Sequence, residues 1–410
     1  MEADAHGRGG RSEAEDEATG TMTIARMGAL LAGVLLAGCT RAHPVLEESR
    51  DAPALAAHAV VDAATATTVA AATTVAAATT VAAATTVATA PPALSWPLPS
   101  PAHLRSLARG AQGFVAMTGH GQRAVVSTND EAALAERPVL VASFTKLWVA
   151  IATLRAVERQ DLSLDDELRA LLPTLKSKPW ADSTVRELLG HTSRVPELDS
   201  DFYSRANVDF SDPATVLGRE LSAATEKRGV WKYRNAEYAL LGAILQARAG
   251  RPVAEVLASE VFEPAGMKHA GILIGRPPEG LDLSPMGSVR PQNFFTAGNG
   301  YASPSDLLAF FEALDSDKLL DLRSRALLFE GNPKHNQAAL GCWAYPFAVG
   351  DGGTTLLVER PGSFGNVRLF TAFFPERHRA ILLWSKAPLD VGRPRSGASL
   401  AAKLARAALE

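Results

Sequence analysis

The feature that most constrains this fold is that strand-type runs lie at both ends of residues 102–410, whereas helix-type patterns fill the middle. Five runs have strand composition: 113–117 and 123–127 near the start, and 354–358, 367–374 and 379–384 near the end. The first two flank turn residues and predict a hairpin, and a closing helix is expected over 398–409. We therefore expect an α+β fold, in which one antiparallel sheet is built from both ends and a mostly α-helical subdomain is inserted within about 160–345.

Several helices in the middle have clear start and stop signals. Ser303 is a good N-cap, Pro304 suits the first helical position, and Asp306 interacts favourably with the helix dipole. Another helix is expected from about 236 to 249, where Gly250 and then Pro252 stop it.

The N-terminal quarter cannot contribute to a core. Residues 1–21 are polar and acid-rich, so we interpret them as disordered or as a start codon assigned too early. Residues 40–101 contain an Ala/Thr/Val repeat of period six followed by clustered prolines, which is the composition of a tether. The remaining 102–410 segment is long enough for one folded domain, since the whole chain is 47% hydrophobic and 21% charged.

Residues 22–39 have the pattern of an export signal. Arg26 supplies a positive charge, 27–38 is an apolar stretch too short to span a bilayer, and Leu36–Cys39 resembles a bacterial lipoprotein processing site. Cleavage before Cys39 would leave its thiol to carry lipid and so anchor the protein to a membrane. The alternative is an ordinary secretory signal with an incidental Cys. Both interpretations predict an exported protein, periplasmic or on the cell surface.

The candidate chemistry begins with Ser143 and Lys146. If residues 144–158 form a helix, these side chains lie three positions apart on one face, which places an amine beside a hydroxyl. A neutral lysine can take the proton of a serine nucleophile, and the helix N-terminus offers N–H groups to an oxyanion. Ser-x-x-Lys is a weak motif by itself, and a capped surface helix is the alternative.

The formal net charge of -3 and the lack of a strongly basic run give no indication of nucleic-acid binding. No zinc-type Cys/His spacing occurs. Of the two cysteines, Cys342 lies between aromatic residues and is expected to be a packed core thiol.

Six segments in this order resemble the serine beta-lactamase and DD-peptidase superfamily, in particular its branch of class C beta-lactamases, D-stereospecific peptidases and related esterases. They are Val141–Lys146, Asp161–Asp166, Thr184–Ser193, Tyr233–Gly242, Phe262–Met267 and Gly298–Leu307. Each is weak alone, but together they cover the folded part of the chain. The resemblance implies a three-layer α/β/α architecture.

The resemblance also implies residue roles. Ser143 would be acylated, Lys146 would accept its proton, Tyr233 would share or relay that proton, and Asn235 would hydrogen-bond the substrate amide and Lys146. An amine and a phenol held close together weaken each other's hold on a proton, which makes a base usable near neutrality. Without the resemblance, Tyr233 would be interpreted as a core aromatic. His191 is expected to be a satisfied buried histidine rather than a base.

The third family element departs from its usual form. The best candidate is Arg360-Pro-Gly-Ser363, where the family has Lys-Thr-Gly or His-x-Gly. Arg360 could hold a substrate carboxylate, and the backbone N–H groups of Ser143 and of the residue after Gly362 could bind an oxyanion, so Gly362 and Ser363 are candidate binding residues. Pro361 removes a backbone N–H. Arg194 also replaces a usual Gly.

Two functional hypotheses follow. The first is a membrane-tethered serine hydrolase that forms an acyl-enzyme on Ser143, with cell-wall D-amino-acid peptides, beta-lactams or esters as substrates and no cofactor. The second is a catalytically impaired relative that binds cell-wall peptide or a partner protein, because its third element is altered.

Overall fold

The computed structural model describes residues 97–128, 135–206, 208–350 and 352–410. The predicted signal, Cys39 and all but the last five residues of the predicted tether lie outside these residues. The described chain falls in one compact unit.

A seven-stranded antiparallel sheet of described residues has the strand order β2-β1-β10-β9-β7-β6, with β8 added beside β9. The strands are β1 (Gly113–Gly119), β2 (Gln122–Ser127), β6 (Trp343–Ala348), β7 (Thr354–Glu359), β8 (Gly362–Phe364), β9 (Val367–Phe374) and β10 (Arg379–Ser385). The N-terminal strand β1 pairs with the C-terminal strand β10 along its whole length, for example Val115 with Leu383. Both strands are buried at every position because helices cover both faces of the sheet.

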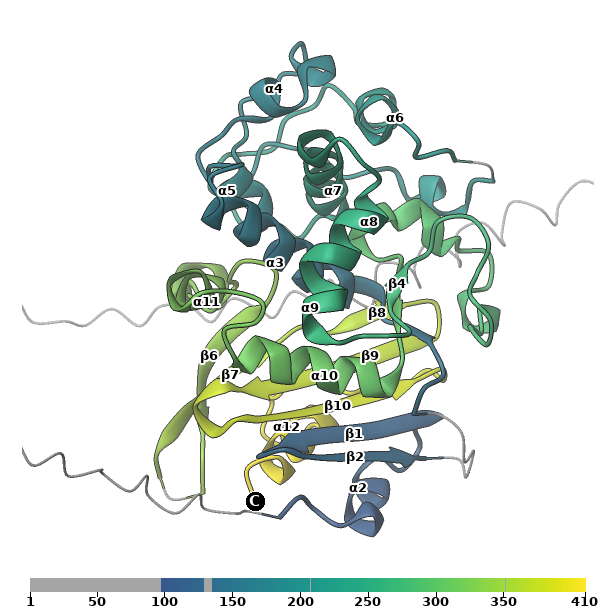
Figure 1. Cartoon of the computed structure of the whole chain (residues 1–410), viewed down its shortest axis with the longest axis vertical. Coiled ribbons are helices and arrows are strands. Elements are labelled where there is room, and N and C mark those ends of the chain that lie inside the picture. The colour runs from purple at the N-terminus through teal and green to yellow at the C-terminus, as the bar shows by residue number, and fades with distance from the viewer. Residues whose placement is uncertain (1–96, 129–134, 207, 351) are drawn as a thin grey trace, which may run out of the picture. The chain divides into compact units, whose positions relative to one another are not determined.

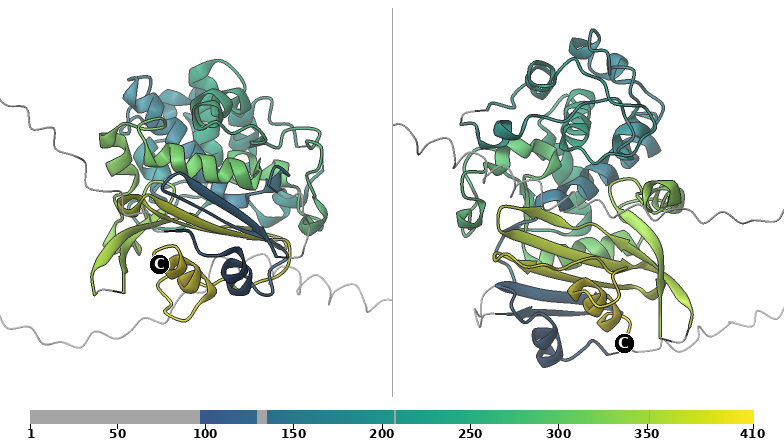
Figure 2. Two further views of the ribbon diagram at one scale, coloured as in Figure 1. Left: turned by 60° about the horizontal axis from the view of Figure 1, so that its bottom comes forward. Right: turned by 180° about the vertical axis from the view of Figure 1, so that it is seen from behind.

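The helices form two outer layers. On one face lie α2 (Pro101–Leu107) and α12 (Leu400–Ala407), and on the other face lies α10 (Pro304–Asp315) with the helical subdomain beyond it (Figures 1 and 2). Each face encloses an apolar cluster, one around Val115, Leu383 and Leu404, the other around Leu382, Trp148 and Phe310. The expected three-layer α+β architecture is therefore confirmed.

The helical subdomain occupies the upper part of Figure 1. Its helices and the adjoining ones are α3 (Thr145–Glu158), α4 (Leu168–Leu171), α5 (Val185–Leu189), α6 (Pro213–Glu220), α7 (Asn235–Ala249), α8 (Val253–Leu257), α9 (Glu263–Ala265) and α11 (Leu322–Leu328). A small sheet in the order β3-β5-β4 lies beside them, formed by Val139–Leu140, Gly300–Ala302 and Gly271–Ile272. Since β3 leads directly into the Ser143 segment, its pairing with β5 fixes where α3 begins.

The predicted helix signals match the structure closely. Ser303 and Asp306 form a capping box at the start of α10, with Pro304 in the first turn. Gly250 ends α7 in the left-handed conformation, as expected for a glycine that follows a helix. The edge strand β6 was not predicted. It contains Pro346, which is tolerated there because an edge strand leaves one side of its backbone unpaired.

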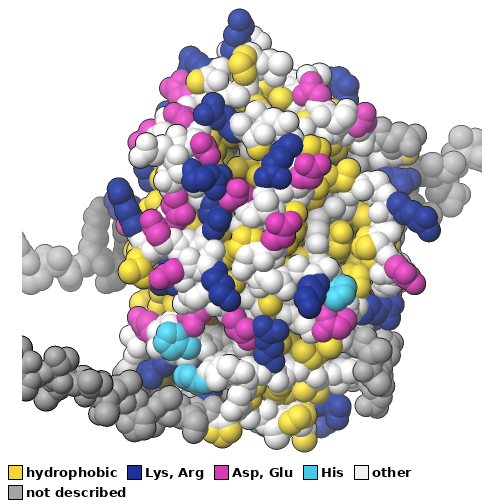
Figure 3. Space-filling view, in the orientation of Figure 1, with side chains coloured by type: hydrophobic (Ala, Val, Ile, Leu, Met, Phe, Trp, Pro, Cys, Tyr) yellow, Lys and Arg dark blue, Asp and Glu magenta, His cyan; other side chains and the backbone are white. Residues whose placement is uncertain are grey.

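No helix among the described residues has the length and the apolar character needed to cross a membrane. On the face shown in Figure 3, basic and acidic side chains are interspersed.

Candidate active site

Ser143 lies in a 3-10 turn, Ala142–Phe144, between strand β3 and helix α3. Ala142 has a φ of 49°, a left-handed conformation that is unusual for a residue with a side chain. The turn is held by Thr145 Oγ1, which donates to the carbonyl of Ala142 at 2.7 Å. Ser143 remains partly exposed although both of its neighbours are buried, so the turn presents its hydroxyl at the surface of a packed core.

Lys146 lies one helical turn beyond Ser143 and is completely buried. Its Nζ donates to Ser143 Oγ at 3.2 Å, to Asn235 Oδ1 at 2.8 Å and to the carbonyl of Ala297 at 2.6 Å. These three acceptors are uncharged. The amine is therefore fixed in position against the serine hydroxyl.

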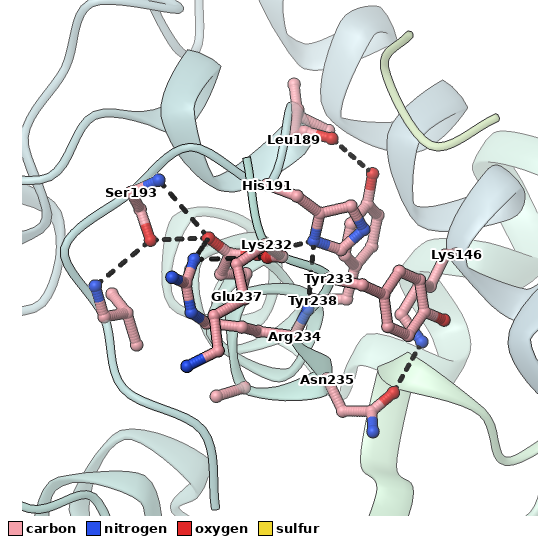
Figure 4. A network of polar contacts seen from close by, with 12 residues as sticks. Lys146, Leu189, His191, Ser193, Lys232, Tyr233, Arg234, Asn235, Glu237 and Tyr238 are labelled. Atoms are coloured by element: carbon pink, nitrogen blue, oxygen red, sulfur yellow. Dashed lines mark hydrogen bonds and ion pairs between the residues drawn. The ribbon is translucent and has the colours of Figure 1, made fainter. Parts of the chain in front are cut away.

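Tyr233 approaches Ser143 from the segment that precedes α7. Its hydroxyl donates to Ser143 Oγ at 2.8 Å, and Lys146 Nζ lies 4.9 Å from the centre of its ring. Ser143 Oγ thus contacts both an amine and a phenol, either of which can exchange a proton with it. Figure 4 shows Tyr233, Lys146 and Asn235 lying near one another.

Arg360 follows β7 and is almost fully buried. Its Nη2 donates to the hydroxyl of Tyr233 at 2.9 Å, and its Nε donates to the carbonyl of Ser143 at 2.8 Å. The guanidinium also lies over the rings of Tyr233 and Trp343, 5.4 Å from each centre. Arg360 therefore binds the same phenol oxygen that contacts Ser143 Oγ. The carboxylate-binding role expected for Arg360 stays a prediction.

Gly362 begins β8, which packs directly against the Ser143 turn. A Cβ at Gly362 would lie 2.1 Å from the carbonyl oxygen of Val141, so only glycine fits there. The next residue, Ser363, is partly exposed. This close approach brings the backbone of β8 beside the Ser143 turn, and the oxyanion-binding role predicted for this backbone stays a prediction.

A buried charged network lies behind Tyr233 (Figure 4). His191 Nδ1 contacts Glu237 Oε2, and Ser193 Oγ donates to Glu237 Oε1 at 2.6 Å. Burial raises the pKa of Glu237 to about 8. Burial, followed by the positive charges of Arg360, Lys146 and Arg234, lowers the pKa of His191 well below its usual value.

His191 is buried, as predicted, but it is not fully satisfied, because its Nε2 has no hydrogen-bond partner among the described residues. Its ring lies 4.7 Å from that of Tyr233 and 5.1 Å from that of Tyr238, which makes it packing support for the site. Its Nδ1 also accepts the backbone N–H of Arg234 at 3.4 Å. His191 therefore ties the 191–193 turn to the segment that carries Tyr233.

The structure brings together Ser143, Lys146, Tyr233, Asn235 and Arg360 through direct contacts. Sequence reasoning missed two contributors, the carbonyl of Ala297 and the carboxylate of Glu197. Glu197 accepts the N–H of Asn235 and that of Ala236, the latter at 3.2 Å. Neither had a local signal, because each reaches the site only through the fold.

One further prediction concerns a group outside the chemistry. Cys342 is buried, and burial raises the pKa of its thiol to about 12, as expected for a packed core cysteine. Within the described part of the chain, no three His, Cys, Asp or Glu side chains are placed to hold a metal ion.

Comparisons with known proteins identify the family of this chain. The family model described as Beta-lactamase matches residues 104–406. PbpX of Bacillus subtilis (strain 168), which carries a penicillin-binding-protein name, is 27% identical over 199 residues, covering 46% of this chain and 49% of that protein. Esterase EstB of Burkholderia gladioli is 31% identical over 154 residues, covering 33% of this chain and 39% of that protein. The matched part thus spans half or less of each relative.

The same fold occurs in solved structures. A D-stereospecific amidohydrolase from Streptomyces sp. superposes with a TM-score of 0.59 at 19% sequence identity, and the match covers 71% of this chain and 95% of the other. At this level of identity the similarity concerns the fold alone.

Proposed function

The chain belongs to the beta-lactamase family, and from that premise we propose that it is a serine hydrolase that forms an acyl-enzyme on Ser143. The observation that carries the proposal is that Ser143 Oγ lies 3.2 Å from Lys146 Nζ and 2.8 Å from the hydroxyl of Tyr233. A serine alone is a poor nucleophile, and this pair supplies the base that activates it.

In the acylation step, Ser143 Oγ attacks the carbonyl carbon of the substrate and its proton passes to the Lys146 and Tyr233 pair. The tetrahedral intermediate carries its negative charge on the former carbonyl oxygen. Backbone N–H groups of Ser143 and Ser363 are the candidate donors to this oxyanion, since Gly362 allows the two segments to approach closely. When the intermediate collapses, the bond to the leaving group breaks and the pair returns the proton to that group.

Deacylation uses the same pair in the same order. Water replaces the departed group and gives a proton to the Tyr233 and Lys146 pair as its oxygen attacks the ester carbonyl. Collapse of the second intermediate breaks the bond to Ser143 Oγ, which recovers the proton, and releases a carboxylic acid. Each proton transfer uses residues that contact Ser143 Oγ directly.

The proposed substrates are D-amino-acid peptides of the cell wall, beta-lactams or esters. EstB carries an esterase name and the Streptomyces protein is a D-stereospecific amidohydrolase, so relatives of this fold act on more than one acyl class. Asn235 is the candidate partner of the substrate amide, because its contact with Lys146 places its side chain at the site.

A tether to a membrane through lipidated Cys39 belongs to the same proposal. The pattern 36–39 supports it, together with the low-complexity stretch that separates Cys39 from the described domain. A lipid anchor of this kind would hold the hydrolase near cell-envelope substrates.

One observation favours a second candidate, a relative that binds without turnover. The strand carrying the third element is interrupted between Glu359 and Gly362, where Pro361 cannot donate a hydrogen bond. Such a protein would retain affinity for cell-wall peptide or a partner protein while failing to hydrolyse it.

A substrate panel distinguishes the two candidates. The full chain is assayed with a D-alanyl peptide, a chromogenic cephalosporin and a p-nitrophenyl ester, beside Ser143→Ala and Lys146→Met. The hydrolase proposal predicts turnover of at least one compound, abolished in both variants. Binding of the peptide without turnover of any compound would favour the second candidate.

A further inference from the structure

Helix α7, which starts with Asn235, lacks a cap of its own. Its N-cap residue Arg234 makes no side-chain capping hydrogen bond. Glu197, which belongs to a different segment, supplies the cap instead. The N–H of Asn235 donates to its Oε2, and the N–H of Ala236 donates to its Oε1. A carboxylate at this end satisfies exposed N–H groups and interacts favourably with the helix dipole.

Glu197 is itself held in place from the other side. Its Oε1 accepts the N–H of Leu198 at 2.8 Å and the hydroxyl of Tyr203 at 3.0 Å. The ring of Tyr203 stacks on Phe294 with 4.3 Å between centres. Burial, followed by the charge of Glu197, raises the pKa of Tyr203 well above its usual value, so the phenol remains a protonated donor.

The two oxygens of Glu197 therefore accept hydrogen bonds from four donors of the protein. Three of these hydrogen bonds are accepted by Oε1, and the fourth, from the N–H of Asn235, is accepted by Oε2. The carboxylate thus serves the protein's own geometry.

The contacts continue from Glu197 to the nucleophile. Asn235 is fixed at its backbone by Glu197 and at its side chain by Lys146, whose Nζ donates to Asn235 Oδ1 at 2.8 Å and to Ser143 Oγ at 3.2 Å. Tyr233 lies two residues before Asn235 and donates to the same Ser143 Oγ. Displacement of the first turn of α7 would move both groups relative to Ser143.

We propose that Glu197 is a positioning residue, which sets the start of α7 and thereby places Asn235 against Lys146 and Tyr233 against Ser143. The inference rests on the proposed function, because acylation of Ser143 is what this placement serves. Misplacement of a reacting group by about 1 Å can slow a reaction about 100-fold.

Two substitutions of Glu197 distinguish the loss of one acceptor oxygen from the loss of the whole carboxylate. Glu197→Gln keeps one acceptor oxygen and replaces the other with an amide NH₂, which cannot accept from the donors on its side. Glu197→Ala removes all four hydrogen bonds. The matched control is Asp212→Ala, because Asp212 caps helix α6 by accepting the N–H of Thr215 at 3.1 Å.

The test measures labelling of the full chain by a fluorophosphonate, resolved into the maximal rate kinact and the half-saturating concentration KI. We expect kinact to fall about 10-fold in Glu197→Gln and about 100-fold in Glu197→Ala, with KI changed less than about 2-fold. Asp212→Ala should react like the wild type. Wild-type kinact in folded Glu197→Ala would overturn the inference, and so would an equal loss in Asp212→Ala.

A crystal structure of Glu197→Ala gives a readout that does not depend on activity. We expect the contact between Lys146 Nζ and Asn235 Oδ1 to be broken. If the wild type is not labelled at all, the proposed function fails, and the structure alone decides the positioning role. Retention of the 2.8 Å contact in the variant would overturn it.

Discussion

Arg360 donates a hydrogen bond from its Nη2 to the hydroxyl of Tyr233 at 2.9 Å while being almost fully buried. Its Nε donates to the carbonyl of Ser143, so the guanidinium bridges the Ser143 segment and the phenol. Arg360, predicted from the family pattern to belong to the third element, thus has an internal partner on each side. This relationship makes Arg360 part of the candidate site.

Substitution of Arg360 is expected to lower kcat/KM, and more so when its charge is removed together with its two hydrogen bonds. Arg360→Lys keeps the charge but cannot reproduce the two-point geometry, and we expect a loss of about 10-fold. Arg360→Met also removes the charge, and we expect a loss of about 100-fold. The control Arg395→Met, which removes an exposed arginine stacked on Tyr345, should stay within about 2-fold. Wild-type kcat/KM in Arg360→Met would contradict this role.

Gly362→Ala is expected to displace the Ser143 turn, because the new Cβ would lie 2.1 Å from the carbonyl oxygen of Val141. We expect kcat to fall about 100-fold and the melting temperature to drop by several degrees, as for other overpacked buried sites. Gly397→Ala is the matched control, since a Cβ there has no neighbour within 4 Å. Equal behaviour of the two variants in activity and thermal melts would refute the steric argument.

The buried pair of His191 and Glu237 predicts a pH dependence of stability. The pKa of Glu237 is raised from 4.5 to about 8 in the folded protein. The stability that protonated Glu237 contributes is therefore fully present below pH 4.5 and is lost as the pH rises through 8. Relative to Glu237→Gln, the wild type should lose on the order of 3 kcal/mol of unfolding free energy between pH 5 and pH 9.

Denaturant titrations of both proteins across this pH range provide the measurement. The lowered pKa of His191 changes the stability in the opposite direction with pH. The stability that neutral His191 contributes is present above about pH 6.5 and is lost on acidification. Because His191 contacts Glu237, the difference between the two proteins reports the titration of this buried pair. A difference that does not change with pH would show that Glu237 keeps an ordinary pKa.

Cys39→Ser tests the proposed tether. If Cys39 carries lipid, the wild type should sediment with membranes and incorporate labelled fatty acid, whereas the variant should be released and unlabelled. Ser143→Ala is the matched control and should stay with the membranes. Equal sedimentation of Cys39→Ser and the wild type, without lipid incorporation in either, would refute the anchor.

Local signals accounted for much of the fold. Alternating or continuous apolar runs predicted β9 and β10, and capping residues predicted the start of α10 at Pro304, because these features depend on nearby residues. The edge strand β6 was missed because its sequence contains Pro346, and only its pairing with β7 makes it a strand.

The residues of the candidate site also divide into those that a sequence pattern predicted and those that only the fold brings together. Ser143 and Lys146 were found because they are three residues apart, and Tyr233 and Asn235 were found through a family pattern. Glu197 was missed because it lies 38 residues before Asn235, and the fold alone brings its carboxylate to the start of α7. The burial of Arg360 was likewise unpredictable, since an arginine in sequence gives no sign of the Tyr233 and Trp343 rings that enclose it.

Intact-protein mass spectrometry of the full chain after exposure to a fluorophosphonate tests whether Ser143 is an activated nucleophile. We expect one adduct on the wild type and none on Ser143→Ala under the same conditions. Circular dichroism establishes that both proteins are folded. A folded wild type that forms no adduct, or an adduct that persists in Ser143→Ala, would show that Ser143 is not the activated nucleophile.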